Sequence, residues 1–165
     1  MAQVATFHIG DELFGVDILL TKEIGKLQEI TEVPMAPDFF LGLMNLRGQV
    51  VTVMDPGVFL DQKCQVAPEE RRLIILKNKG ELDDLFRNDL IEETSMSRDT
   101  LAIVIDRIGD VVEVADEDIR PTPPNLSVVK KEFVSGIIQQ QSKLIILLDM
   151  GALAKRCIPK EEAVN

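Results

Sequence analysis

The chain has 165 residues, which suffices for one compact domain or for two small halves that share a core. Its hydrophobic content of 45% excludes a disordered chain, and its net charge of −10 makes nucleic acid an unexpected partner. The longest apolar runs have the length of strands and no signal peptide precedes them, so we expect no membrane insertion. Two cysteines in unrelated contexts are read as reduced thiols, which indicates a cytoplasmic protein.

Short β-strands make up most of the predicted structure. Runs rich in Val, Ile and Leu recur along the chain between Gly, Asp, Asn and Pro, a pattern typical of strands. Strands this short, joined by turns and present in two copies, favour two small barrels over a sandwich. The predicted strands are residues 4–9, 15–20, 49–55, 71–77, 101–108, 111–114 and 144–149.

Two segments are predicted to be helical. Apolar residues recur at helical spacing between residues 82 and 90, which predicts an amphipathic helix from 81 to about 93. This helix lies in an insertion of roughly residues 82–99. Asp149 is a plausible N-cap for a terminal helix from Met150 to Cys157, which Pro159 would end.

The sequence repeats itself. Residues 38–60 align without gaps on residues 132–154, and matched glycines at a fixed offset indicate an internal duplication. More loosely, residues 14–18 resemble 102–106, and residues 30–34 resemble 119–123. We therefore expect a single domain, 1–165, with barrel halves of about 1–70 and 71–150 and a C-terminal helix and tail of about 150–165. The matched pairs include Phe39 with Phe133, Gly42 with Gly136, Asp55 with Asp149 and Gly57 with Gly151.

The residues needed for catalysis are not found together. His8 is the only histidine, and it stands in a predicted strand without the partners that a general base needs. One histidine and two distant cysteines do not make a zinc site, and neither GxGxxG nor GxxxxGK[ST] occurs. We expect no catalytic residues, no cofactor and no metal, so the protein is predicted not to be an enzyme.

Several motifs resemble those of a known family. VPMAPDF at residues 33–39, followed by Gly42 and by NLRG at residues 45–48, resembles CheW-like domains. The second half contributes VVEV at 111–114 and LIILLD at 144–149 in the same order. The resemblance extends from about residue 4 to residue 155.

The resemblance implies both a fold and a function. The implied fold is two intertwined, SH3-like, five-stranded β-barrels with a hydrophobic groove between them. The implied function is that of a non-enzymatic adaptor with two partners. One partner is the regulatory domain of a CheA-type histidine kinase, and the other is the helical cytoplasmic tip of methyl-accepting chemoreceptors.

The resemblance also assigns partner-binding roles. Arg47 stands at the position of the family's functionally important arginine, and Glu23 stands at an acidic position near the receptor site. Gly42 matches a glycine on which the same region depends. Arg47 is notable on its own account because its counterpart in the second copy is Gln141, so the shared fold does not require arginine there. The alternative is an ordinary solvated turn arginine. The other expected partner-binding residues are Thr21, Val16, Ile18, Ile24, Leu43 and Asn45, of which Val16, Ile18, Ile24 and Leu43 would line a groove for an amphipathic helix.

Three departures from the family pattern bear on partner identity. Thr21 stands where valine is common, Pro56-Gly57 follows the strand-end aspartate, and the insertion lengthens a hairpin. A second hypothesis is a small-ligand-binding or metabolic β-barrel protein unrelated to signalling.

Overall fold

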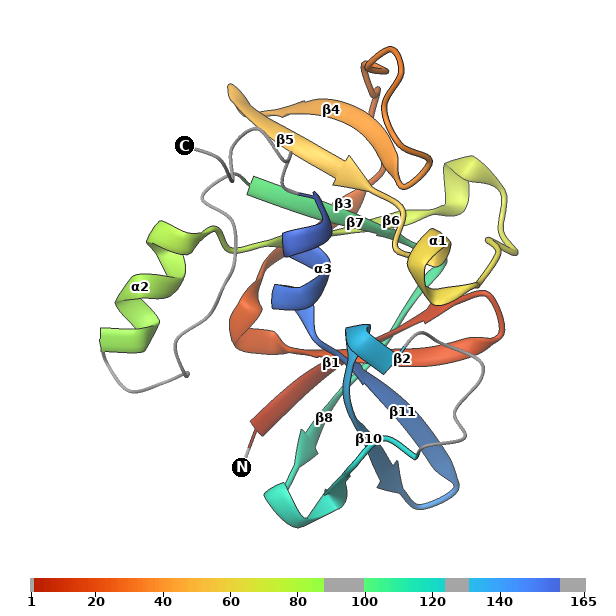
Figure 1. Cartoon of the computed structure of the whole chain (residues 1–165), viewed down its shortest axis with the longest axis vertical. Coiled ribbons are helices and arrows are strands. Elements are labelled where there is room, and N and C mark those ends of the chain that lie inside the picture. Colours follow the sequence, from red (N-terminus) through yellow and green to blue (C-terminus); the bar gives the residue numbers. More distant parts are fainter. Residues whose placement is uncertain (1, 88–99, 124–130, 158–165) are drawn as a thin grey trace.

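The computed structural model describes residues 2–87, 100–123 and 131–157. The fold in these ranges is mainly β, as predicted (Figure 1). The strands are β1 Ala2–Ile9, β2 Glu12–Asp17, β3 Thr21–Lys26, β4 Phe40–Leu46, β5 Gln49–Met54, β6 Arg72–Leu76, β7 Thr100–Ile105, β8 Arg107–Val114, β9 Ile119–Arg120, β10 Val134–Gln140 and β11 Lys143–Leu148. The helices are α1 Gly57–Leu60, α2 Lys79–Arg87 and α3 Met150–Cys157, with short 3-10 turns η1 Ile18–Leu20, η2 Pro68–Glu70, η3 Asp116–Asp118 and η4 Lys131–Phe133.

The strands form two sheets. One has five strands in the order β3-β6-β7-β5-β4, and the other has six in the order β8-β1-β2-β11-β10-β9. In Figure 1 the first sheet occupies the upper part of the molecule and the second the lower part, with α3 between them. In neither sheet do the two edge strands pair with each other through backbone hydrogen bonds. Any contact between the two edges is therefore made by side chains.

The two sheets exchange their hairpins. The β1–β2 hairpin belongs to the first half of the sequence but pairs with β8 and β11, while the β6–β7 hairpin of the second half pairs with β3 and β5. The predicted boundary near residue 70 therefore separates two sequence repeats, but it does not separate the two sheets. Each sheet is completed by a hairpin from the other repeat.

The internal duplication is confirmed at the level of single hydrogen bonds. The β4–β5 and β10–β11 hairpins carry the same register shift, between Phe40 and Gly42 in one and between Val134 and Gly136 in the other. The backbone N–H of Asp55 donates to the carbonyl of Phe39 over 2.7 Å, and that of Asp149 donates to the carbonyl of Phe133 over 2.8 Å. Both copies therefore end in the same local structure.

The looser upstream matches are confirmed in one place and wrong in another. Thr31 bridges to Leu43, and Arg120 pairs with Ile137, so segments 30–34 and 119–123 occupy equivalent places. However, Phe14 occupies the place of Leu101 and not that of Ala102, because Ile146 pairs with Phe14 while Thr52 pairs with Leu101. Every residue of β7 is buried, so no polar alternation marks its register in the sequence.

The buried apolar residues form three clusters, of which one joins the two sheets. The largest lies between the sheets and includes residues of β1, β2, β5, β6, β7 and β11 together with all three helices. Two smaller clusters fill the inner faces of the individual sheets. In the shared cluster the ring of Phe59 lies 4.6 Å from that of Phe39 and 5.1 Å from that of Phe133, centroid to centroid. The two matched phenylalanines thus meet at one ring in α1.

Two predicted strands differ from those in the structure. The strand predicted at 15–20 stops at Asp17, whose Oδ1 accepts from the N–H of Leu19 over 2.9 Å and so begins the turn η1. The strand predicted at 101–108 is divided at Asp106 into β7 and β8. Strands β3, β4 and β10 were not predicted, since their glycines and polar residues interrupt the apolar pattern. The two-residue strand β9 was not predicted either.

The predicted helices are found. Asp149 caps α3 by accepting from the N–H of Ala152 over 3.0 Å, and α3 ends at Cys157 as far as the structure describes it. Helix α2 begins at Lys79, and Leu82 from its first turns is fully buried in the shared cluster. The predicted extension of this helix to residue 93 lies outside the described residues.

Leu82→Ala is expected to lower the free energy of unfolding by about 2–4 kcal/mol, because it leaves a cavity in the shared core. Asp83→Ala, the next residue of the same helix, should change it by less than about 0.5 kcal/mol. Urea unfolding followed by circular dichroism measures both. Equal, small effects would show that α2 does not contribute to the core.

Candidate functional site

An ion pair joins the two edges of the five-stranded sheet. Arg47, in the turn between β4 and β5, pairs through Nη2 with Oε2 of Glu23 on β3. The Arg47 side chain is 68% exposed and that of Glu23 is 31% exposed, so the pair lies at the surface. Surface pairs contribute about 0–1 kcal/mol, so this pair orients two charged side chains more than it stabilises the fold.

The six-stranded sheet is closed differently at the corresponding place. Gln140, at the end of β10, donates through Nε2 to the carbonyl of Glu113 on β8 over 2.6 Å. β8 stands in this sheet where β3 stands in the other, and β10 stands where β4 does. The two contacts therefore differ in chemistry: the first uses two charged side chains and the second a neutral amide.

The turn that carries Arg47 is conformationally demanding. Arg47 has φ 51° and Gly48 has φ 85°, both in the left-handed region that a type I′ turn requires. The Oδ1 of Asn45 accepts from the N–H of Gly48 over 2.9 Å and fixes the turn. Gln141 has almost the same φ, 52°, so this backbone shape belongs to the shared fold and does not explain why one copy has arginine.

Gly42 holds β4 against the segment that precedes it. Its φ is +148°, and a Cβ at this position would collide with the side chain of Ile30 and the carbonyl of Thr31. Thr31 and Leu43 exchange two backbone hydrogen bonds of 2.8 and 2.9 Å beside it. Gly42 is therefore required for the close approach of these two backbones.

The structure separates the other expected site residues into exposed and buried groups. Ile24 on β3 is 44% exposed, Leu43 on β4 is half-buried, and Ile18 is half-buried in η1 just before β3. Thr21 begins β3 and donates through Oγ1 to the carbonyl of Ile18 over 2.8 Å. Asn45 is exposed on β4.

The assignment of Val16 to an exposed groove is wrong. Val16 has no exposed surface, and it packs in the apolar cluster between the sheets. It lies on β2, which belongs to the six-stranded sheet, whereas Glu23 and Arg47 lie on the other sheet. A branched apolar residue that is buried between two sheets has the same sequence pattern as one that lines a groove, so the sequence did not distinguish the two.

Sequence reasoning did not find a second ion pair beside Glu23. Lys22 Nζ lies 3.0 Å from Oε2 of Glu81, in the first turn of α2. Burial favours the neutral form of Glu81, but the hydrogen bond from the Asn78 backbone and the charge of Lys22 outweigh it and hold the pKa of Glu81 below its usual value. The stability from this pair is thus present above the ordinary glutamate pKa and is lost as the pH falls through the lower folded value. The Asn78-x-x-Glu81 spacing, a capping-box signature, could have indicated the fixed position of Glu81.

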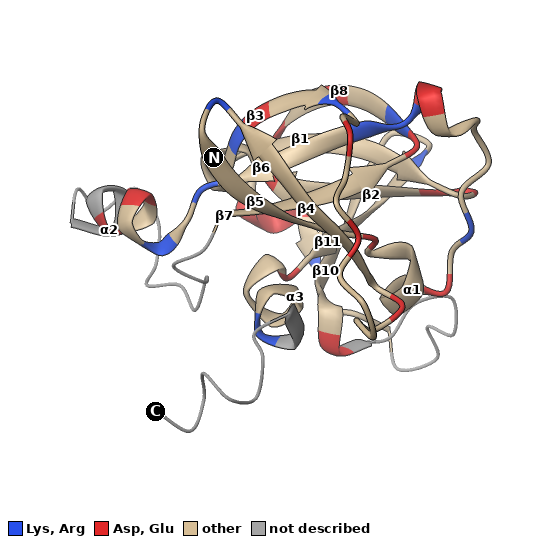
Figure 2. Ribbon diagram, turned by 90° about the horizontal axis from the view of Figure 1, so that it is seen from above, with Lys and Arg blue, Asp and Glu red and all other residues tan. Residues whose placement is uncertain are grey.

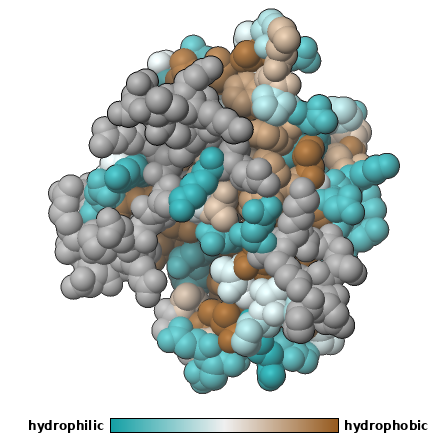
Figure 3. All heavy atoms as spheres, in the orientation of Figure 1, coloured by the Kyte–Doolittle hydropathy of each residue, from teal (hydrophilic) through white to brown (hydrophobic). Residues whose placement is uncertain are grey.

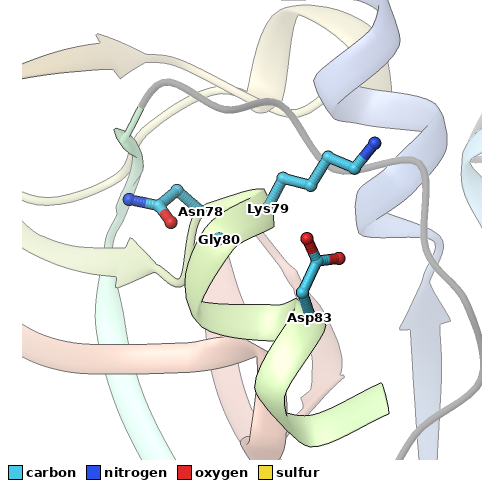
Figure 4. Close-up of a pocket in the computed structure, with 4 residues that line it drawn as sticks. All are labelled: Asn78, Lys79, Gly80 and Asp83. Atoms are coloured by element: carbon cyan, nitrogen blue, oxygen red, sulfur yellow. The ribbon is translucent and has the colours of Figure 1, made fainter. Parts of the chain in front are cut away.

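The start of α2 also borders a shallow hollow. Asn78, Lys79, Gly80 and Asp83 line a space of about 330 Å³ (Figure 4). In that view Lys79 and Asp83 project to one side of the helix start and Asn78 to the other. These are ordinary solvated groups around a helix cap.

A buried carboxylate fixes the opposite end of the molecule. Asp106 is 1% exposed, and its Oδ2 accepts from the N–H groups of Gly10 (3.1 Å) and Gln65 (2.9 Å). Its own N–H donates to the carbonyl of His8 over 2.9 Å. Asp106 therefore ties the β1–β2 turn and the loop after α1 to the junction of β7 and β8.

Charged groups are dispersed over the described chain, and apolar groups are dispersed over the described part of one face. Figure 2 shows acidic and basic residues on loops, helices and outer strands of the described chain. On the face seen in Figure 3, apolar surface forms small patches separated by polar residues. The described residues contain no group of three His, Cys, Asp or Glu side chains that could hold a metal ion. Within the same residues, no helix is long and apolar enough to cross a membrane.

The two sheets with exchanged hairpins place this chain among duplicated SH3-like β proteins. A family model described as CheW-like domain matches residues 3–157, and the chain belongs to that family. It is similar to the chemotaxis protein CheW of Treponema pallidum, with 30% identity over 151 residues, 92% of this chain and 81% of that protein. It is also similar to the chemotaxis protein CheW of Klebsiella aerogenes, with 29% identity over 89% of this chain and 78% of that protein.

A solved structure supports the same conclusion. The crystal structure of the scaffolding protein TtCheW from Thermoanaerobacter tengcongensis superposes with a TM-score of 0.74 and 25% sequence identity. The match covers 92% of this chain and 86% of that chain. The SH3-like fold expected from the sequence is therefore confirmed.

Gly42→Ala is expected to destabilise the protein by about 2–3 kcal/mol, because it combines a strained φ with a collision against Thr31. Gly25→Ala on β3 is the matched control, since a Cβ there would meet no atom within 4 Å. Thermal unfolding of the two variants tests the difference. Similar stabilities would mean that the Thr31 segment does not pack on β4 as described.

Proposed function

We propose that this protein is a non-enzymatic adaptor that couples chemoreceptors to a CheA-type histidine kinase. The observation that carries the proposal is the CheW-like family match over residues 3–157. It is supported by relatives named as chemotaxis proteins and by the neighbouring structure described as a scaffolding protein. The family match favours this function over a small-ligand or metabolic role.

The chemistry of the five-stranded sheet suits a protein partner. The Arg47 side chain is mostly exposed, and a planar guanidinium can pair with a partner carboxylate through two hydrogen bonds. Because the Arg47–Glu23 pair is exposed and worth little, exchanging Glu23 for a partner's carboxylate costs little. We assign Arg47 and Glu23 to the partner interface on this basis.

Apolar residues on the outer face of the sheet would supply the remaining contact area. Ile24 follows Glu23 on β3, so its side chain points to the opposite face of that strand, where it is exposed. Leu43 is half-buried and lies on the same face of β4 as Asn45. An amphipathic receptor helix binds by placing its apolar stripe against such residues while charged side chains pair at the rim. The proposed surface comprises Ile18, Thr21, Glu23, Ile24, Leu43, Asn45 and Arg47, with Gly42 supporting its backbone.

Reversing the charge of Arg47 tests the proposal. Arg47→Glu should leave the fold intact, since the turn side chain buries little, and should weaken partner binding by about 2 kcal/mol or more, roughly thirtyfold. Isothermal titration with a CheA-type regulatory domain and, separately, with a receptor cytoplasmic-tip fragment measures the effect on each partner. Unfolding curves confirm that the variant is folded.

Gln141→Glu is the matched control, because Gln141 has the same backbone conformation in the second copy. We expect little effect of this substitution on either partner. Equal, small effects of both substitutions would return Arg47 to an ordinary solvated turn residue. Failure of the unaltered protein to bind either partner would refute the adaptor function itself.

A further inference from the structure

Helix α2 is joined to β3 at the residue immediately before Glu23. Lys22 pairs with Glu81 at 3.0 Å, and the N–H of Lys77 donates to the carbonyl of Leu20 over 2.9 Å. The chain leading into α2 and the chain leading into β3 are thus connected through the backbone as well as by charge. The start of the helix and the start of β3 are therefore in direct contact.

The carboxylate of Glu81 is held in place from its own side. Its Oε1 accepts from the N–H of Asn78 over 3.1 Å, while Asn78 Oδ1 accepts from the N–H of Glu81 over 3.0 Å. One oxygen of Glu81 therefore serves the helix cap, and the other serves Lys22. The next residue, Leu82, is fully buried between the sheets. Glu81 is a fixed anchor rather than a freely moving surface charge.

Lys22 occupies an irregular position in β3. The pairing of β3 with β6 shifts register between Thr21 and Glu23, which leaves Lys22 as the extra residue. Extra residues of this kind redirect the side chains around them. Lys22 is exposed and Glu23 is half-buried, and their side chains reach different partners, Glu81 and Arg47. Two ion pairs on successive residues therefore hold β3 where its register changes.

We propose that Glu81 is a positioning residue for the partner surface, acting through Lys22 to fix the orientation in which Glu23 and Arg47 meet a protein partner. This inference rests on the proposed adaptor function and gives the inserted helix a part in it. Glu81 itself does not touch the partner. By this contact, helix α2 limits the movement of β3 around Lys22 and so influences the affinity of the surface for its partner.

Glu81→Gln tests this role with little damage to the helix, because glutamine at this position also completes a capping box. It removes the charge that holds Lys22. We expect binding of the receptor fragment to weaken by about three- to tenfold, which lies within the range seen for residues that couple to a site without touching it. Asp83→Asn is the control, since it removes the same charge from the same helix at a residue that borders the hollow of Figure 4. Its effect should be below about twofold.

The route through Arg47 is tested by combining variants. In an Arg47→Gln background, Glu81→Gln should have little further effect on binding, because the group that it positions is gone. A full, additive effect in that background would show that Glu81 acts independently of Arg47 and would overturn the inference. So would equal effects of Glu81→Gln and Asp83→Asn in the otherwise unaltered protein.

A measurement without any partner separates this inference from the adaptor proposal. In nuclear magnetic resonance spectra of the free protein, Glu81→Gln should shift the backbone amides of Lys22 to Ile24 and the Nε–H of Arg47, whereas Asp83→Asn should not. Unshifted resonances would overturn the positioning role even if both partners bind. If the unaltered protein binds neither partner, the adaptor proposal fails, and the resonance shifts still decide whether Glu81 positions Arg47.

Discussion

The structure depends on the exchange of hairpins between the two repeats. Because β1–β2 completes the sheet of the second repeat and β6–β7 completes that of the first, neither repeat can bury its apolar residues alone. The shared cluster joins both hairpins to α1, α2 and α3, so folding of the two halves is expected to be a single cooperative event. The pairings involved connect residues far apart in the sequence, which predicts slow folding relative to a protein of local contacts.

The duplication makes departures from symmetry informative. Matched positions agree where the fold needs them: Phe39 and Phe133 both meet Phe59. The side chains of Asp55 and Asp149 each accept a backbone N–H from the helix that follows, although from Gly57 in one copy and from Ala152, which does not align with Gly57, in the other. The copies differ in the side-chain contact between equivalent strands, which is the Arg47–Glu23 pair in one sheet and the hydrogen bond from Gln140 to β8 in the other. The shared backbone does not require this difference, so we explain it by function. For this reason we place the proposed partner surface at Arg47 and Glu23.

The sequence predicted the features that depend on local chemistry. The cap at Asp149, the helix around Leu82, the matched ends of the repeats and the turn at Arg47 follow from residue types at fixed spacing, and all are found. Features that depend on which face of a strand is buried were not predictable. Val16 was placed in a groove although it is buried between the sheets, and the match of Phe14 was wrong by one residue because every residue of β7 is buried. The Lys22–Glu81 pair joins distant segments, and a single sequence does not reveal such a contact.

The proposed surface combines a rigid backbone with side chains that can change partners. Gly42 and the Thr31–Leu43 hydrogen bonds fix β4, while the Asn45 side chain fixes the turn and Leu82 fixes the start of α2. The Arg47–Glu23 and Lys22–Glu81 pairs, by contrast, are partly solvated and individually weak. A partner that offers a carboxylate to Arg47 would therefore replace one weak pair with another without disturbing the backbone. Its affinity would then depend on how well Arg47 is oriented beforehand, since preorganised groups lose less entropy on binding.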